Sequence, residues 1–412
     1  MRISTLQAFN NGVTGIQRNY ANATRTQEQI STGNRILTPA DDPVASVRLL
    51  QLEQQQNVLG QYNSNLTAAK NSLTQEEVTL NSVNTVLQRV RELAVQAGNG
   101  ALDPQDRKAI SAELGEREDE LLALMNTRNA RGEYLFSGFQ GKTQPFVRGS
   151  DGSYSYQGDE GQRKLQIASS LNIPISDNGK SIFESVTNAG RLKTELSPQG
   201  GSTLSVSAPL IQDEVAFANF PNGGITITFG ADNSYVITPD EAGATDLSGT
   251  LQGDPAKTRS VVFRGVVLQF DGLPAAGDEV VIGPKVDADG KPNAQKQGIL
   301  DTIANLRSAL ENPATGNTGV RDAVAVALTN LDHGMISVDE ARGNIGARLN
   351  VIETTLTDNE DVALVNKGVQ AELRELDYAE ALSRLSMQTV VLEAAQQSYV
   401  KISGLSLFNV MR

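Results

Sequence analysis

The sequence predicts a mainly α-helical protein with an inserted β domain: a long coiled-coil-like helical bundle from both chain ends, plus a β-rich outer domain. Heptad-spaced apolar residues near both ends predict the helices, and a central region without helical periodicity predicts the insertion. The changes in pattern divide the chain into an N-terminal assembly helix and turn at 1–44, a helical rod domain at 45–134, the β-rich domain at 135–297, the second part of the rod domain at 298–376, and a C-terminal assembly helix at 377–412.

The first rod segment carries a leucine at every seventh position. Such a row, with further apolar residues three positions on, has a period of 3.5 and is typical of a helix lying lengthwise against other helices. From about residue 45 to 97 this helix would be roughly 80 Å long at about 1.5 Å per residue. A helix of this length indicates packing and assembly rather than a substrate pocket. The row consists of Leu52, Leu59, Leu66, Leu73, Leu80, Leu87 and Ala94.

Two Asp-Pro pairs predict where helices begin. Asp42 precedes Pro43 at the start of the rod, and Asp103 precedes Pro104 at the start of a third helix. An aspartate accepts hydrogen bonds from the first free backbone N–H groups, and proline fits the first helical position, which needs no donor. Both aspartates are therefore predicted helix caps. The turn at residues 98–100 lets the third helix run antiparallel to the rod.

Both termini carry a seam, meaning a row of apolar residues at alternating spacings of three and four. In the first helix, Asn10, Asn11 and Gly12 lie between the seam residues, and all three are poor helix formers. We therefore expect both ends to be disordered in the monomer and to fold when neighbouring subunits cover them. The alternative is an ordinary bundle within one chain. The predicted assembly-interface residues are Leu6, Phe9, Val13, Ile16, Tyr20, Leu385, Leu392, Tyr399 and Ile402.

The central region has short alternating runs separated by turns rich in glycine and aspartate, which predict strands. Helical periodicity returns at residues 298–310 and, after a loop at 312–319, continues from about residue 320. The predicted strands lie at 134–139, 153–156, 164–167, 225–229, 235–238, 261–270 and 279–282.

Composition argues against several classes of function. A net charge of −13 disfavours nucleic acid and anionic membrane surfaces as partners. The absence of cysteine excludes thiolate metal sites, and the one histidine, His333, is expected to be a packing or surface residue. No catalytic, cofactor-binding or metal-binding residues are predicted, and no membrane insertion or cleaved signal peptide. Asp41 is either a solvated loop residue or a partner for Arg35.

Several segments resemble the flagellin-like axial proteins of the bacterial flagellum. Residues 30–45 are similar to the turn that follows the first helix in that family, and their Leu-Thr-Pro-x-Asp-Asp-Pro form resembles its hook–filament junction members. Residues 131–146 resemble the same members' exit into the outer domain, and residues 401–408 their ending. The resemblance covers 1–145 and about 320–412, whereas the β domain matches only at residues 272–278.

This resemblance implies a structural, non-enzymatic adaptor of the hook–filament junction, outside the cell on the bacterial flagellum. It implies export without a cleaved signal peptide, and assembly into a ring by coaxial packing of the terminal helices. The implied partners are other copies of the chain, hook-associated protein 1, flagellin, and a flagellar export chaperone at the C-terminus. A flagellin filament subunit remains the first alternative. An extracellular glycan-binding or enzymatic protein that uses its β domain is the second.

Overall fold

The computed structural model describes residues 2–100, 102–254, 257–286, 293–312 and 316–410, and only the backbone of 2–6, 8, 316–317 and 403–410. The chain divides into two compact units. Unit 1 contains Met1–Leu66 and Glu353–Arg412, and unit 2 contains Thr67–Ile352. Long helices at both ends of the chain and a strand-rich centre confirm the predicted fold class.

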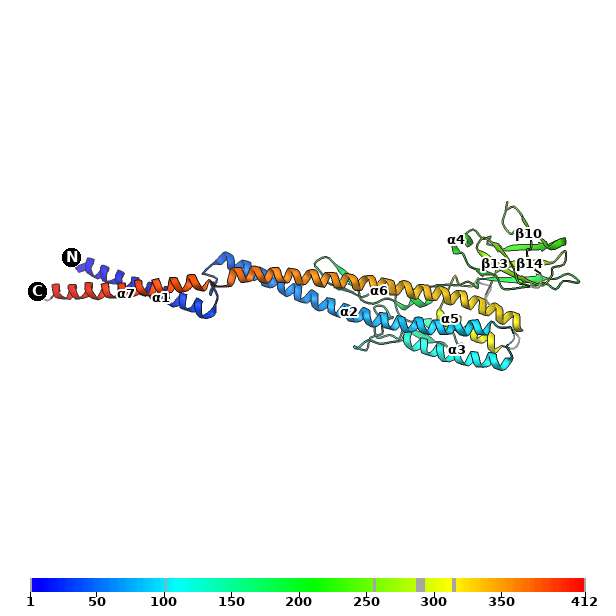
Figure 1. Ribbon diagram of the computed structural model, residues 1–412, viewed down its shortest axis with the longest axis horizontal. Coiled ribbons are helices and arrows are strands. Elements are labelled where there is room, and N and C mark those ends of the chain that lie inside the picture. Colours follow the sequence, from blue (N-terminus) through cyan, green and yellow to red (C-terminus); the bar gives the residue numbers. More distant parts are fainter. Residues whose placement is uncertain (1, 101, 255–256, 287–292, 313–315, 411–412) are drawn as a thin grey trace. The chain divides into compact units, whose positions relative to one another are not determined.

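Unit 1 is built from four helical pieces. Helices α1 (Arg2–Thr32) and α7 (Tyr378–Val410) pack along each other, and Figure 1 shows both chain ends on this pair. The start of α2 (Pro43–Ala97) and the end of α6 (Gly316–Arg374) supply the other two pieces. Unit 1 therefore combines segments from the two opposite ends of the sequence.

The helical part of unit 2 contains the rest of α2 and α6 together with α3 (Pro104–Met125) and α5 (Ile299–Glu311), and α3 packs on α5. Leu73, Leu80 and Leu87 of the leucine row of α2 are fully buried here, and Ile110, Leu114 and Leu121 of α3 are buried too. Glu118 is also fully buried, where it accepts a hydrogen bond from Tyr154 Oη at 2.5 Å and lies 3.3 Å from Arg307 Nε. A polar network thus joins α3, α5 and a strand inside an aliphatic core.

The strand-rich part of unit 2 is a β-sandwich with small hairpins beside it. Strands β11 (Leu247–Thr250), β10 (Ser234–Pro239), β9 (Ile225–Phe229), β14 (Glu279–Pro284) and β6 (Leu192–Ser197) form one antiparallel sheet in that order. Strands β12 (Arg259–Phe263), β13 (Val266–Asp271), β7 (Ser205–Val206) and β8 (Leu210–Ile211) form the second sheet. Alternate residues of both sheets share one core, in which the Phe229 and Phe270 rings lie 5.5 Å apart.

Three two-stranded pairs and three short helices complete the described part of unit 2. The strand pairs are β1 (Phe146–Arg148) with β2 (Tyr154–Tyr156), β3 (Lys164–Gln166) with β4 (Asn172–Pro174), and β5 (Val186–Thr187) with β15 (Lys296–Gln297). The short helices are η1 (Lys180–Glu184), α4 (Glu214–Phe217) and η2 (Ala231–Asn233).

Two strand predictions were wrong in detail. Residues 134–139 form turns rather than a strand, with isolated bridges from Tyr134 to Arg128 and from Ser137 to Asn178. Their alternating pattern reflects burial of Leu135 and Phe136 in an irregular segment. The run 261–270 is two strands, because the chain reverses at Arg264 and Gly265, both with positive φ. In addition, α6 begins at Gly316, inside the predicted loop.

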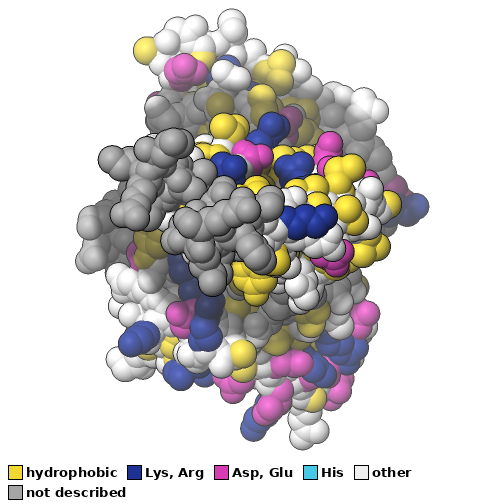
Figure 2. Space-filling model, turned by 90° about the vertical axis from the view of Figure 1, so that its left-hand side faces the viewer, with side chains coloured by type: hydrophobic (Ala, Val, Ile, Leu, Met, Phe, Trp, Pro, Cys, Tyr) yellow, Lys and Arg dark blue, Asp and Glu magenta, His cyan; other side chains and the backbone are white. Residues whose placement is uncertain are grey.

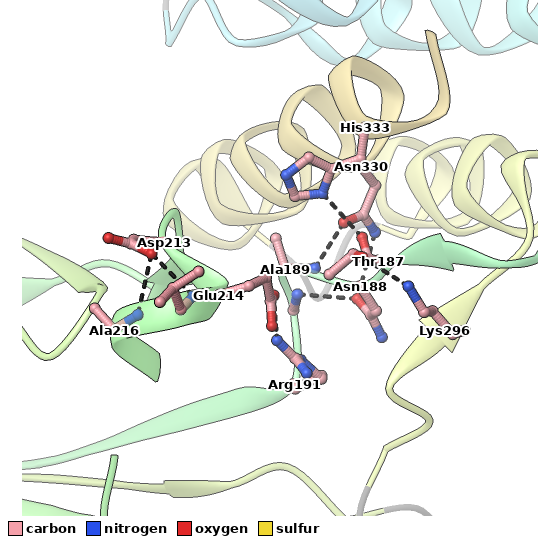
Figure 3. Close-up of polar contacts among 12 residues, drawn as sticks. Thr187, Asn188, Ala189, Arg191, Asp213, Glu214, Ala216, Lys296, Asn330 and His333 are labelled. Atoms are coloured by element: carbon pink, nitrogen blue, oxygen red, sulfur yellow. Dashed lines mark hydrogen bonds and ion pairs between the residues drawn. The ribbon is translucent and has the colours of Figure 1, made fainter. Parts of the chain in front are cut away.

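A short polar segment leads from the helical part of unit 2 into the sandwich (Figure 3). Asn330 of α6 accepts a hydrogen bond from the Ala189 N–H at 2.7 Å and donates one to Asn188 Oδ1 at 3.3 Å. One turn further on, His333 Nδ1 lies 3.1 Å from the Thr187 carbonyl oxygen. The backbone of residues 187–189 is therefore fixed by side chains of α6, and His333 has the packing role that its isolation in the sequence indicated.

Candidate assembly interface

The terminal pair, α1 with α7, contains all nine predicted assembly residues. On α1, Val13 and Ile16 are half-buried, and Ala23 and Thr26 are buried. On α7, Leu385, Leu392 and Tyr399 are half-buried at sevenfold spacing. The two helices thus cover each other along one seam, as heptad spacing requires.

Specific contacts fix the register of this seam. The Phe9 and Tyr399 rings lie 5.1 Å apart, tilted by 48°. A Cβ added at Gly12 would lie 3.2 Å from Tyr399 Cδ2, so this glycine leaves room for the aromatic ring. Further along, Thr26 Oγ1 donates a 2.8 Å hydrogen bond to Gln388 Oε1. This polar pair favours one register of the two helices, because sliding one helix along the other would break the hydrogen bond between Thr26 and Gln388.

The row that packs within the chain differs from the apolar row in the sequence. It passes through Asn19 and Thr26, whereas Tyr20 is 63% exposed and Gln27 is exposed too. Ile402 is also exposed, and the side chain of Leu6 lies outside the described residues. Periodicity alone could not find Asn19 and Thr26, because both are polar.

Apolar side chains remain on the surface of the terminal pair outside its seam. Figure 2 views the structure from the side on which Figure 1 marks both termini, and hydrophobic side chains are visible in yellow among charged ones. On a monomeric protein such a row indicates an interaction surface. The exposed residues are Tyr20 on α1, and Tyr378, Leu382, Met387, Val390, Val391, Val400 and Ile402 on α7. Phe9 is 48% exposed as well, although its ring contacts Tyr399 in the seam.

A hollow of about 190 Å³ lies between the two helices of the pair. Its lining combines apolar side chains of α7 with amide groups from both helices. Arg384 at its edge is held by Glu380 of the same helix, with Nη2 to Oε1 at 2.8 Å. The hollow is lined by Asn19, Asn22, Arg384, Met387, Gln388 and Val391.

Both long helical paths of unit 1 are interrupted, and the interruptions pair with each other. Asn34 and Glu375 form an antiparallel bridge, with hydrogen bonds from Arg35 N to Arg374 O at 2.8 Å and from Leu376 N to Gly33 O at 3.0 Å. These two bonds pair some of the backbone groups that the interrupted helix ends leave free. No pattern in the sequence relates these two distant sites.

The turn that follows α1 is organised by Asp41. Its Oδ2 accepts hydrogen bonds from the backbone N–H groups of Leu37 at 2.9 Å and Thr38 at 3.1 Å, and its carboxylate contacts the Arg25 guanidinium. Asp41 is thus neither solvated nor the partner of Arg35, whose guanidinium lies 3.9 Å from Asp42. The two alternatives expected for Asp41 were therefore both wrong.

The predicted caps lie at the starts of two helices. Asp42 Oδ1 accepts a hydrogen bond from the Ala45 N–H at 3.0 Å at the start of α2. Asp103 Oδ1 accepts from the N–H groups of Gln105 and Asp106, each at 2.8 Å, at the start of α3. Each cap satisfies donors that the first helical turn leaves free.

Metal-ligand clusters are not found in the described part of the chain. Among residues 2–410, gaps aside, no three His, Cys, Asp or Glu side chains gather as metal ligands would. Nor does any described helix combine the length and apolar content that crossing a membrane requires.

Comparisons with known proteins bear directly on this arrangement. The sequence profile of the family described as the bacterial flagellin N-terminal helical region matches residues 3–141. The first third of the chain is thus similar to the flagellin N-terminal helical region. Over its whole length the chain is similar to flagellar hook-associated protein 3 of Escherichia coli K12, with 24% identity over 413 residues and 100% of both chains covered.

Two further relatives support the same assignment of similarity. The chain is 23% identical over 389 residues to a flagellin of Clostridium tyrobutyricum. This alignment covers 94% of this chain and 95% of the flagellin. The crystal structure of the flagellar junction protein FlgL from Legionella pneumophila matches with a TM-score of 0.62 and 26% identity, over 80% of this chain and 100% of that chain. The resemblance predicted from residues 30–45 and 131–146 is confirmed, and it is to flagellar hook-associated protein 3.

Proposed function

We propose that this protein is a structural, non-enzymatic adaptor subunit of the bacterial flagellar hook–filament junction. Its terminal pair packs against the terminal pairs of neighbouring copies, which together form a ring. The observation that carries this proposal is the exposed apolar surface of α1 and α7 beyond their single shared seam. The full-length similarity to flagellar hook-associated protein 3 supports the same role.

The energetics favour assembly of the terminal pair over exposure to water. Fully burying an aliphatic side chain is worth about 1.5–3 kcal/mol. Several such side chains per subunit would offset the entropy cost of ordering two long helices. Because α1 contains Asn10, Asn11 and Gly12, its own helix propensity contributes little. The expectation that both ends are disordered in the monomer and fold when neighbouring subunits cover them stays a prediction, and within the single chain α1 and α7 already cover each other along one seam.

The proposed role implies the location and the partners. The chain would lie outside the cell on the flagellum, reached by export without a cleaved signal peptide. Within the ring it would contact further copies of itself, and at the two ring faces hook-associated protein 1 and flagellin. An export chaperone would bind the C-terminal helix before assembly, since that helix exposes the longer apolar row.

A pair of exposed residues on α7 tests the proposal. Val390→Ser with Val400→Ser removes apolar surface that the monomer does not bury, so a folded monomer is expected. In a flagellated strain lacking its own copy, this variant should leave hooks without filaments and shed flagellin into the medium. Gln397→Ser, at an exposed polar site on the same helix, is the matched control and should restore swimming. Normal filaments with the valine double variant would contradict the proposal.

The seam itself gives a second test. Leu392→Ala with Tyr399→Ala weakens the contact between α1 and α7, and should also prevent attachment of filaments while unit 2 stays folded. Loss of the whole folded structure would instead favour an intramolecular bundle. Growth of the purified chain into long filaments would favour the flagellin alternative, which the similarity to a full-length flagellin keeps open.

A further inference from the structure

A buried carboxyl lies on α2 within unit 2, far from the terminal pair in sequence. Glu76 is 1% exposed, and its Oε1 accepts a hydrogen bond from the Asp177 N–H at 3.1 Å. A lone carboxylate at such a site is strongly disfavoured unless it is paired or neutral. No guanidinium or ammonium bonds directly to Glu76 among the contacts of the described residues.

The Arg348 guanidinium pairs with the neighbouring carboxylate, Asp177, and not with Glu76. Asp177 is buried and receives two hydrogen bonds from Arg348 of α6, with Nη1 to Oδ2 and Nη2 to Oδ1 both at 2.9 Å. Gln162 Nε2 donates a third at 2.7 Å. Arg163, the other cation facing this site, is engaged by Glu133, with Nη1 to Oε2 at 2.8 Å. The cluster therefore holds one carboxyl more than its guanidinium groups neutralise.

The cluster connects three parts of unit 2. Glu76 belongs to α2 and Arg348 to α6, whereas Asp177 follows the β3–β4 hairpin. Residues 163 and 175, which flank the β3–β4 hairpin, are joined by a hydrogen bond from Ile175 N to Arg163 O at 2.8 Å. The side chains of Ile167 and Ile173 in this segment are buried. Release of Asp177 would thus remove the polar attachment of residues 162–178 to both helices.

We propose that Glu76, Asp177 and Arg348 form a proton-dependent lock that holds residues 162–178 against α2 and α6 while Glu76 is protonated. A neutral Glu76 still accepts the Asp177 N–H bond and adds no second negative charge beside the Asp177–Arg348 pair. An ionised Glu76 would repel Asp177 at a site that water does not reach. Opening of the segment lets water solvate the carboxylate.

The protonation behaviour of Glu76 is consistent with this geometry. Burial, and after it the charge of Asp177, raises the pKa of Glu76 to about 8, against the opposing effects of the Asp177 N–H, Arg348 and Arg163. In the opened segment the pKa returns toward 4.5, so the closed form binds more protons between these two values. The closed form is therefore favoured below about pH 4.5 and loses stability as pH rises to about 8, above which the dependence levels off.

Hydrogen exchange of the whole chain tests the lock. The opening constant of residues 162–178, corrected for the intrinsic exchange rate, is measured by mass spectrometry from pH 5 to 9. It should rise up to about tenfold per pH unit between pH 5 and 8, since one proton is released on opening, and then level off. Glu76→Gln mimics the neutral carboxyl and should give a flat profile. Glu77→Gln, at the half-buried neighbour, is the control and should keep the wild-type slope.

Two outcomes would overturn the proposal: a flat wild-type profile, or an unchanged slope in Glu76→Gln. A direct titration covers the case in which that variant does not fold. Glutamate labelled with ¹³C at the carboxyl carbon reports each titration in the wild-type protein by NMR. One glutamate with a midpoint near 8 supports the lock, whereas titration of all glutamates below pH 6 overturns it.

Discussion

The leucine row of α2 provides the sharpest test of how burial varies along one helix. Leu80 is fully buried in unit 2, whereas Leu52, four heptads earlier in the same row, is only half-buried in unit 1. The two positions have the same residue, the same heptad phase and the same kind of helix. We compare Leu80→Ala with Leu52→Ala, because helix propensity changes little and equally in both.

The expected magnitudes differ severalfold. At Leu80 the variant loses the full transfer free energy and leaves a cavity among packed neighbours, for a cost of about 3–5 kcal/mol. At Leu52 the side chain already contacts water, so the cost should be about 1 kcal/mol. A loss of about 4 kcal/mol is a large fraction of the stability of a typical domain.

Urea unfolding followed by circular dichroism at 222 nm measures both effects. Leu80→Ala should lower the midpoint strongly, and Leu52→Ala only slightly, with similar slopes for the transition that each affects. Equal losses of stability at the two sites would refute the reasoning, because the row would then be buried to the same extent throughout. A large loss of stability in Leu52→Ala with little loss in Leu80→Ala would mean that Leu52, and not Leu80, is the buried residue.

Three further substitutions have defined outcomes. Asp103→Ala removes acceptors for two backbone N–H groups of α3 and should cost about 1 kcal/mol in urea unfolding; an unchanged midpoint would deny it a capping role. Gly33→Ala places a Cβ at φ 71° and 2.9 Å from Tyr378 Oη, so it should cost about 1–3 kcal/mol and speed hydrogen exchange around the paired breaks; unchanged exchange would mean that the site tolerates a side chain. Asn330→Ala leaves the Ala189 N–H without its acceptor and should cost about 1–3 kcal/mol, with faster exchange at residues 187–189; wild-type exchange there would show that water replaces the amide.

The candidate interface shows where sequence reasoning reached its limit. Heptad spacing identified Val13, Ile16 and Leu392, because a repeat of 3.5 places such residues on one face. It could not separate residues that face the partner helix from those that stay exposed, since Tyr20 fits the repeat and is exposed. The buried Thr26 contributes a hydrogen bond to a helix more than 300 residues away, and no local pattern encodes that pairing.

Sequence patterns were enough to predict the elements that depend on interactions within a few residues: the long heptad helices, the caps at Asp42 and Asp103, and seven of the fifteen described strands. These follow from periodicity and from backbone groups that nearby side chains satisfy. Which of these elements meet depends on the three-dimensional packing of the chain. The pairing of the two helix breaks, the order of the strands and the burial of Glu76 beside Asp177 depend on contacts between segments far apart in the chain. Such contacts are set by the packing of the whole molecule, so no window of sequence contains them.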